Sequence, residues 1–93
     1  MKKKIDFRQI EVSEGYEGKD KAIYDVSKTL SATIYKSADT YEDFELGKQI
    51  CFHGEVEIDK SQAETIKQYA SIGLKPFVRP AINDALDNLF NNN

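Results

Sequence analysis

Residues 49–68 read QICFHGEVEIDKSQAETIKQ, and they contain the clearest start and stop signals of the chain. Gly54 is a natural helix terminator, because a residue without a Cβ reaches the left-handed conformation at little cost. Val56 and Ile58 then alternate with glutamates, which is the pattern of a strand with one buried face. The stretch therefore predicts the end of a helix, a short strand and the start of a new helix.

The new helix has two overlapping start signals. Asp59 and Gln62 have the spacing of a capping box, in which side-chain oxygens satisfy the free amides of a first turn. Ser61 and Glu64 offer the same spacing slightly further along. Either start predicts a helix whose apolar stripe consists of Ala63, Ile66, Tyr69 and Ala70.

The segment before Gly54 has two interpretations. Thr40 can cap a helix that begins at Tyr41, and the inner stripe of this helix would consist of Tyr41, Phe44, Gly47, Ile50 and Cys51. Alternatively, residues 49–58 form a hairpin that turns at His53 and Gly54. We favour the helix, because residues 41–51 show no alternation of polar and apolar side chains. Gly47 would then lie inside a helix, where a close helix crossing explains it.

The N-terminal part predicts an antiparallel β-hairpin. Residues 4–12 and 21–26 are strand candidates, and a glycine-containing loop separates them. The apolar residues of the first strand change parity between Phe7 and Ile10. Either both faces of this strand are partly covered, or a bulge near Arg8 and Gln9 resets its register.

Two further helices complete the expected chain. One runs from a cap at Asp25 or Ser27 to about Ser37, and its apolar residues recur at steps of three and four. The last begins near Pro80, or begins near Pro76 and kinks, because proline inside a helix removes a backbone hydrogen bond. Gly73 ends the helix before it, and residues 91–93 are expected to form a polar, frayed end.

These elements predict a single small α+β domain over residues 1–93. An N-terminal β-hairpin and one further short strand would carry three to four short helices packed on them. The composition is that of an ordinary globular protein, with 40% hydrophobic and 31% charged residues.

Charge and patterning disfavour several classes of function. The net charge is −3, and the one basic run, Lys2 to Lys4, is joined only by Arg8, so a nucleic-acid binder is not favoured. No apolar run approaches the roughly 20 residues of a membrane span. No apolar segment follows the N-terminal lysines, so no signal peptide is expected. Cys51 is the single cysteine, which excludes an internal disulfide, and the expected location is the cytoplasm.

No catalytic, cofactor-binding or metal-binding motif is recognisable. Cys51 and His53 would point away from each other on a helix, whereas on a hairpin strand they would share a face. Zinc sites require three or four such ligands, and the chain has one cysteine and one histidine. We therefore expect no enzyme, no cofactor and no small-molecule substrate. His53 is expected to interact with free carbonyls at the end of its helix.

A contact surface is the remaining expectation. Four aromatic residues exceed what a core of this size needs, and these candidate protein contacts are Tyr16, Tyr35, Tyr41 and Phe90. Internal packing is the alternative for each one taken alone. We expect a non-enzymatic interaction or accessory protein, either a homodimer or the binder of another protein. A weak nucleic-acid-associated regulator is the second interpretation.

Three segments carry a resemblance to known proteins: DVSKTLSATIY at 25–35, FELGKQI at 44–50, and GEVEID at 54–59 before a helix. Together they resemble small uncharacterised proteins encoded by bacterial prophages and mobile elements. The resemblance covers about residues 25–85 and leaves out the N-terminal hairpin. It implies a bacterial or phage origin and an accessory or assembly role, and it brings no catalytic residues.

Overall fold

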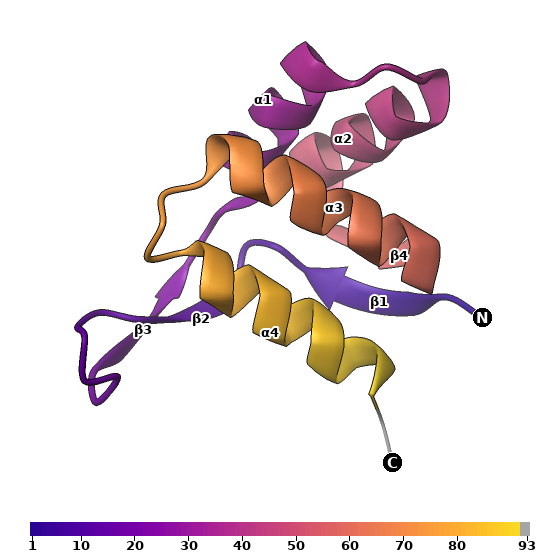
Figure 1. Cartoon of the computed structure of the whole chain (residues 1–93). Coiled ribbons are helices and arrows are strands. Elements are labelled where there is room, and N and C mark those ends of the chain that lie inside the picture. The colour runs from indigo at the N-terminus through magenta and orange to yellow at the C-terminus, as the bar shows by residue number, and fades with distance from the viewer. Residues whose placement is uncertain (92–93) are drawn as a thin grey trace.

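Four short strands and four helices follow one another along residues 1–91, the part of the chain that the computed structural model describes. In chain order they are β1 (Lys3–Asp6), β2 (Ile10–Ser13), β3 (Lys21–Tyr24), α1 (Ser27–Ser37), α2 (Tyr41–His53), β4 (Glu55–Ile58), α3 (Lys60–Gly73) and α4 (Arg79–Phe90). The predicted α+β fold class is confirmed (Figure 1). A frayed end was expected at residues 91–93, and residues 92 and 93 of it lie outside the described part of the chain.

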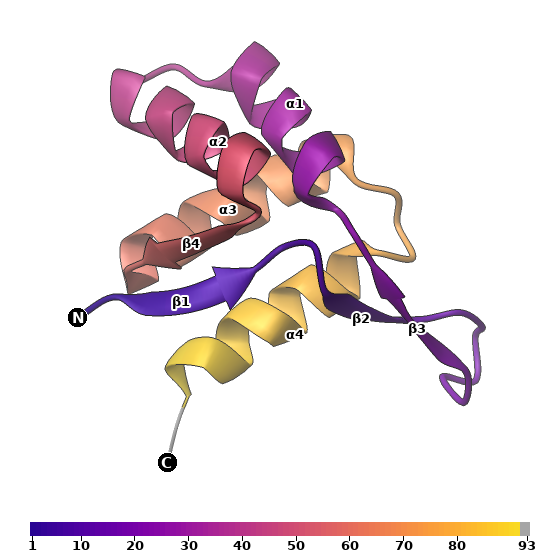
Figure 2. The same ribbon diagram turned by 180° about the vertical axis from the view of Figure 1, so that it is seen from behind.

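The β1–β4 strand pair lies behind α3 and α4 in the view of Figure 1. α1 and α2 lie side by side at one end, α3 crosses the middle, and α4 lies at the other end (Figures 1 and 2). The β2–β3 hairpin projects from this body on the side away from the N-terminus. No helix in residues 1–91 is both long enough and apolar enough to cross a membrane.

The strands pair as two separate antiparallel sheets. β2 and β3 form the predicted hairpin, with Ile10 opposite Tyr24. β1 pairs instead with β4, with Lys3 opposite Ile58. This second pairing was not predicted, because it joins segments that are far apart in the sequence.

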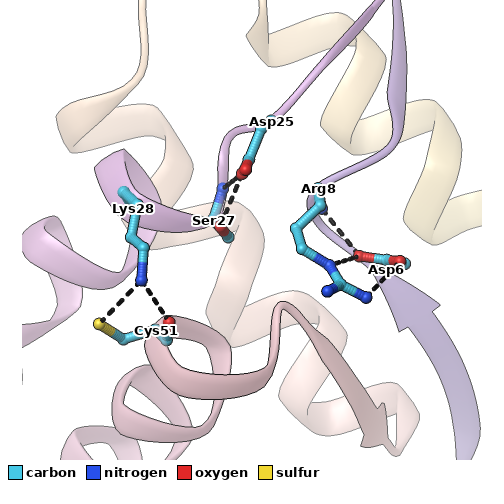
Figure 3. Close-up of polar contacts among 6 residues, drawn as sticks. All are labelled: Asp6, Arg8, Asp25, Ser27, Lys28 and Cys51. Atoms are coloured by element: carbon cyan, nitrogen blue, oxygen red, sulfur yellow. Dashed lines mark hydrogen bonds and ion pairs between the residues drawn. The ribbon is translucent and has the colours of Figure 1, made fainter.

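A turn at residues 7–9 divides the long strand predicted for residues 4–12. The Asp6 carboxylate accepts hydrogen bonds from the Arg8 backbone amide at 2.9 Å and from the Arg8 guanidinium at 2.9 and 3.0 Å (Figure 3). The change of parity therefore comes from a turn closed by this pair, rather than from a bulge in a continuous strand. As a result Phe7, Ile10 and Val12 are all buried.

Phe7 connects the two sheets. Its backbone amide donates to the Gly54 carbonyl at 2.9 Å, at the start of β4. Its carbonyl accepts from the Val26 amide at 2.9 Å, at the start of α1. The Phe7 side chain is fully buried, so this one turn residue joins the beginnings of β4 and α1 to the core.

The helix interpretation of residues 49–58 is confirmed, and the hairpin alternative is wrong. α2 ends at His53, and Gly54 follows it with a φ of 71°. In β4, Val56 and Ile58 are buried, while the glutamates between them are exposed. A strand with one buried face therefore follows the helix, as predicted.

Side-chain caps begin two of the helices, α3 and α2, and no side chain caps α1. The Asp59 carboxylate accepts from the Gln62 backbone amide at 2.7 Å, and the Gln62 side-chain oxygen accepts from the Asp59 backbone amide at 2.9 Å. This pair, and not Ser61 with Glu64, forms the capping box of α3. Thr40 accepts from the Asp43 amide at 3.1 Å in α2. At α1 the N-cap position is Val26, while the Asp25 carboxylate accepts from the Ser27 amide at 3.0 Å and its hydroxyl at 2.6 Å (Figure 3).

Two glycines allow close helix crossings. A Cβ on Gly47 would lie 2.7 Å from Ile34 Cγ2, which confirms the crossing of α1 and α2 expected there. A Cβ on Gly73 would lie 2.7 Å from Thr33 Cβ, so α3 also approaches α1 closely. Gly73 ends its helix without a positive φ, so this position does not need glycine for its backbone conformation. It needs glycine because Thr33 leaves no room for a side chain.

α4 begins at Arg79 with Pro80 in its first turn, which agrees with the first of the two expected starts. Ile82 and Leu86 are buried against the rest of the core, and Lys67 of α3 forms an ion pair with Asp87 of α4. The buried apolar residues form one cluster, with α3 between the α1–α2 pair and α4.

Candidate functional site

A hollow of about 530 Å³ lies between α1 and α2 on the outer surface. Its lining residues occur at the same helical spacing in both helices, at 28, 31, 32, 35 and 36 in α1 and at 44, 47, 48, 51 and 52 in α2. This i, i+3, i+4, i+7, i+8 spacing places each set on one face of its helix. Both helices therefore turn a second, outward stripe toward the same hollow, in addition to the stripe that enters the core.

Small residues create the floor of this hollow. Gly47 has no side chain, and Ile34 occupies the space that a Cβ would need. Ala32 and Ser31 line the α1 side, and the Ser31 hydroxyl turns back to donate to the Lys28 carbonyl at 3.1 Å. The polar atom of Ser31 is thus satisfied within its own helix, which leaves an apolar floor.

Aromatic side chains stand at both ends of the floor. At one end the rings of Tyr35 and Phe44 contact each other, with centroids 5.2 Å apart and a tilt of 44°. Tyr35 at this end is 69% exposed. At the other end lies Phe52, which is 72% exposed. Apolar surface left in water at both ends of an apolar floor is a feature of interaction sites.

Three lysines surround the hollow, Lys28 and Lys36 from α1 and Lys48 from α2. Among residues 1–91 none of the three forms an ion pair, and no acidic residue lines the hollow. The protein carries a net charge of −3, so this site is positive on a negative molecule.

Lys28 also closes one end of the hollow. Its Nζ donates to the Cys51 carbonyl at 2.7 Å and lies 3.8 Å from Cys51 Sγ (Figure 3). This ammonium group therefore satisfies a free carbonyl in the last turn of α2, as cations do at helix C-termini. That role was predicted for His53, whose side chain is exposed and makes no hydrogen bond in the described part of the chain.

A second hollow, of about 740 Å³, lies between the β2–β3 hairpin and the start of α4. Tyr16 and Phe77 are its aromatic residues. Its charged lining consists of Glu11, Glu14, Lys21 and Asp84. The two hollows are thus opposite in charge, since acids predominate in the second and lysines surround the first.

The structure separates the four predicted contact residues. Tyr35 lines the first hollow, and Tyr16 lines the second. Tyr41 is 76% exposed at the first position of α2 and lies in neither hollow, so its predicted place in the inner stripe is wrong. Phe90 is partly buried and packs against the core. Their role as contacts stays a prediction, and they do not form one surface.

Sequence reasoning missed Phe52 and assigned Phe44 to the core. The available signal was the recurrence of aromatic and lysine residues at positions 28, 35 and 36 and at 44, 48 and 52. Its meaning depends on the two helices lying antiparallel and adjacent. The contacts of Lys28 with Cys51 and of Tyr35 with Phe44 show that arrangement.

The groups with shifted pKa values lie outside both hollows. Burial, followed by a hydrogen bond from its hydroxyl to Asp43 at 2.8 Å, raises the pKa of Tyr69 to about 12. The hydrogen bonds from Arg8 lower the pKa of Asp6, and those from Ser27 lower the pKa of Asp25. Each of these shifts has a structural partner that explains it.

Cys51 and His53 are not brought together. Cys51 contacts Lys28, and no hydrogen bond within residues 1–91 joins the thiol to the imidazole. The described residues also contain no group of three or more His, Cys, Asp or Glu side chains placed to hold a metal ion.

Comparison of the chain with protein-family models, with curated proteins and with solved structures finds no match. The hollow between α1 and α2 is therefore assigned as the candidate site on its own geometry and charge.

Proposed function

We propose that this protein acts by binding another protein or a second copy of itself, and that it is not an enzyme. The observation that supports the proposal is the hollow between α1 and α2, where Tyr35, Phe44 and Phe52 surround an apolar floor on the outer surface. Aromatic residues are enriched in protein interfaces, because burying them on association removes a large apolar area from water.

We further propose an accessory or assembly role in the cytoplasm, in a phage or mobile-element context. The single cysteine and the resemblance over residues 25–85 support this setting. The identity of the neighbouring genes tests this proposed setting. Capsid or tail genes would support assembly, whereas an integrase or repressor gene would support regulation.

Self-association is tested by light scattering of the chain at micromolar concentrations. A mass above 10.6 kDa that falls in the Phe52→Ser variant supports association through the hollow. The matched control is Ile72→Ser, because Ile72 is 64% exposed and lines neither hollow. A single 10.6 kDa species at every concentration would remove self-association and leave binding to another protein.

The non-enzymatic part has its own test. Cys51→Ser and His53→Ala remove the only thiol and the only imidazole. Cys51 also lines the hollow, so Cys51→Ser is judged in samples whose association is intact. Under that condition we expect both variants to preserve every phenotype of the gene. Loss of a phenotype in a variant that still folds and associates normally would contradict the proposal.

A second candidate function is nucleic-acid-associated regulation. Lys28, Lys36 and Lys48 favour it, because lysines beside aromatic rings also suit a nucleic-acid strand. The test is a salt titration of binding to duplex and single-stranded DNA of arbitrary sequence. Absence of binding at low salt would remove this function.

A further inference from the structure

The length of the hollow limits what it can hold. Its lining runs from Lys28 to Lys36 in α1 and from Phe44 to Phe52 in α2. At 1.5 Å per residue, each wall is about 12 Å long, which corresponds to roughly two turns of a helix. The site therefore accepts a short, rod-like segment and not an extended protein surface.

The walls favour a helix over an extended strand. Both walls are α-helices, whose amides and carbonyls are bonded within the helix. They offer no strand edge with which an extended segment could pair, so such a segment would bury its own backbone groups unsatisfied. A helix satisfies its backbone internally and presents apolar side chains at i, i+3 or i+4, and i+7 to an apolar floor.

The charge around the floor selects among helices. Lys36 and Lys48 are exposed and form no ion pair within residues 1–91, and no acid lines the hollow. Glutamate or aspartate beside the apolar face of an incoming helix would pair with them and speed its approach. A basic helix would be repelled.

Two other occupants are disfavoured, a second copy by the charge and a nucleic-acid strand by the arrangement of the aromatic rings. A second copy that docked hollow to hollow about a two-fold axis would bring two sets of three lysines together. A nucleic-acid strand stacks successive bases on open aromatic faces, but the Tyr35 and Phe44 rings contact each other with centroids 5.2 Å apart, which leaves Phe52 as the one ring of the hollow free of an aromatic neighbour within residues 1–91.

We infer that the hollow between α1 and α2 binds one amphipathic helix of a partner protein, with an apolar face about two turns long and acidic residues beside it. This inference rests on the proposed function and names the chemistry of its partner.

The test uses two labelled peptides of about 15 residues, because shorter isolated helices are marginal in water. Both carry leucine at helical i, i+3 and i+7 positions, with glutamates beside the leucines in one and lysines in the other. We expect the acidic peptide to bind the full chain at least about tenfold more tightly at low salt, and the difference to shrink as salt is added. Amide chemical shifts should change along residues 28–36 and 44–52.

Matched variants locate the binding. Lys48→Glu should weaken the acidic peptide about fivefold, since it replaces attraction by repulsion at the rim. Lys75→Glu makes the same charge change at an exposed position outside both hollows and should leave the affinity unchanged. Phe52→Ala should weaken the acidic peptide about tenfold. Circular dichroism checks that each variant is folded.

Four results would overturn the inference. They are equal binding of the two peptides, shift changes confined to residues outside α1 and α2, displacement of the acidic peptide by a single-stranded oligonucleotide, and absence of binding by the acidic peptide. Light scattering of the same samples tests the proposed function separately. If the protein self-associates and Phe52→Ala removes that association, the proposed binding function stands, with a second copy as the partner.

Discussion

Gly54 is the residue whose conformation leaves least freedom to substitute. Its φ of 71° and ψ of −39° form a region that side chains enter only under strain, and a Cβ there would lie 2.6 Å from Arg8 Cγ. We predict that Gly54→Ala lowers the free energy of unfolding by about 1–3 kcal/mol, measured by urea denaturation. Gly15→Ala is the control, because its Cβ would meet nothing within 4 Å. Equal losses in both variants would contradict the strain argument.

Tyr69 couples stability to alkaline pH. The pKa of its hydroxyl is about 12 in the folded protein, against 10.0 for an unperturbed tyrosine. The unfolded chain therefore loses this proton first, so the contribution of Tyr69 is complete below pH 10 and is lost as the pH rises toward 12. We predict that Tyr69→Phe is less stable by about 1 kcal/mol at neutral pH, because the hydrogen bond to Asp43 is lost.

The same variant should show a shallower fall in stability above pH 10, measured by urea denaturation across that range. The pKa of Tyr24 is also raised, by its hydrogen bond to Glu14, so the difference between the two proteins isolates Tyr69. Parallel pH profiles for the protein and its Phe variant would contradict the assignment.

At the scale of helices and strands, the crossing of α1 and α3 depends on Gly73. Alanine is the better helix former, but its Cβ would lie 2.7 Å from Thr33 Cβ and Cγ2. We predict that Gly73→Ala destabilises the protein by about 1–3 kcal/mol in thermal or urea unfolding, because the helices must move apart. Adding Thr33→Ala should recover only part of this loss, since the Thr33 Cβ position stays occupied. A gain in stability for Gly73→Ala alone would show that this crossing yields easily.

Local signals predicted the four helices and the strand at residues 55–58, but they did not predict the division of the strand at residues 4–12 or the long-range pairing. The terminator at Gly54, the alternation through Ile58 and the capping box at Asp59 each depend on neighbours within a few residues. The pairing of β1 with β4 joins residues 3–6 to residues 55–58. Alternation of polar and apolar residues shows that a segment is a strand, but it does not indicate which other strand pairs with it. For the change of parity near Arg8 we expected either a bulge or a strand covered on both faces. The turn was not predicted, because the sequence does not show that the Arg8 side chain folds back to pair with Asp6.

For the molecule as a whole, Phe7 is the common contact of its parts. Its side chain is fully buried, and its backbone bonds to the beginnings of β4 and α1. Phe→Ala in a core costs about 3–5 kcal/mol, a large share of the 5–15 kcal/mol that stabilises typical domains. We predict that Phe7→Ala lowers the stability of all elements together, with fluorescence and circular dichroism giving the same midpoint.

Phe7→Leu serves as the milder variant, and it should lose about 1 kcal/mol while staying folded. Separate midpoints for the two spectroscopic signals would indicate that the β2–β3 hairpin unfolds independently of the helices.

The candidate site also belongs to this largest scale. Tyr35 was selected from the sequence as a surplus aromatic residue, and it does line the hollow. Phe52 was overlooked and Tyr41 was misplaced, because a helical stripe gives the angles of side chains and not the position of the next helix. The hollow lies between two helices, with Gly47 lining it from one and Ala32 from the other, and no single segment reveals it.

The pairing of β1 with β4 has a consequence for synthesis on the ribosome. Residues 3–6 emerge before their partner residues 55–58, and α1 and α2 are made in between. The nascent chain therefore carries an unpaired strand edge until β4 has been made, and Lys3 and Lys4 provide charge there that discourages aggregation. Replacing these lysines with apolar residues should increase misfolding and aggregation during synthesis more than it lowers the stability of the folded protein.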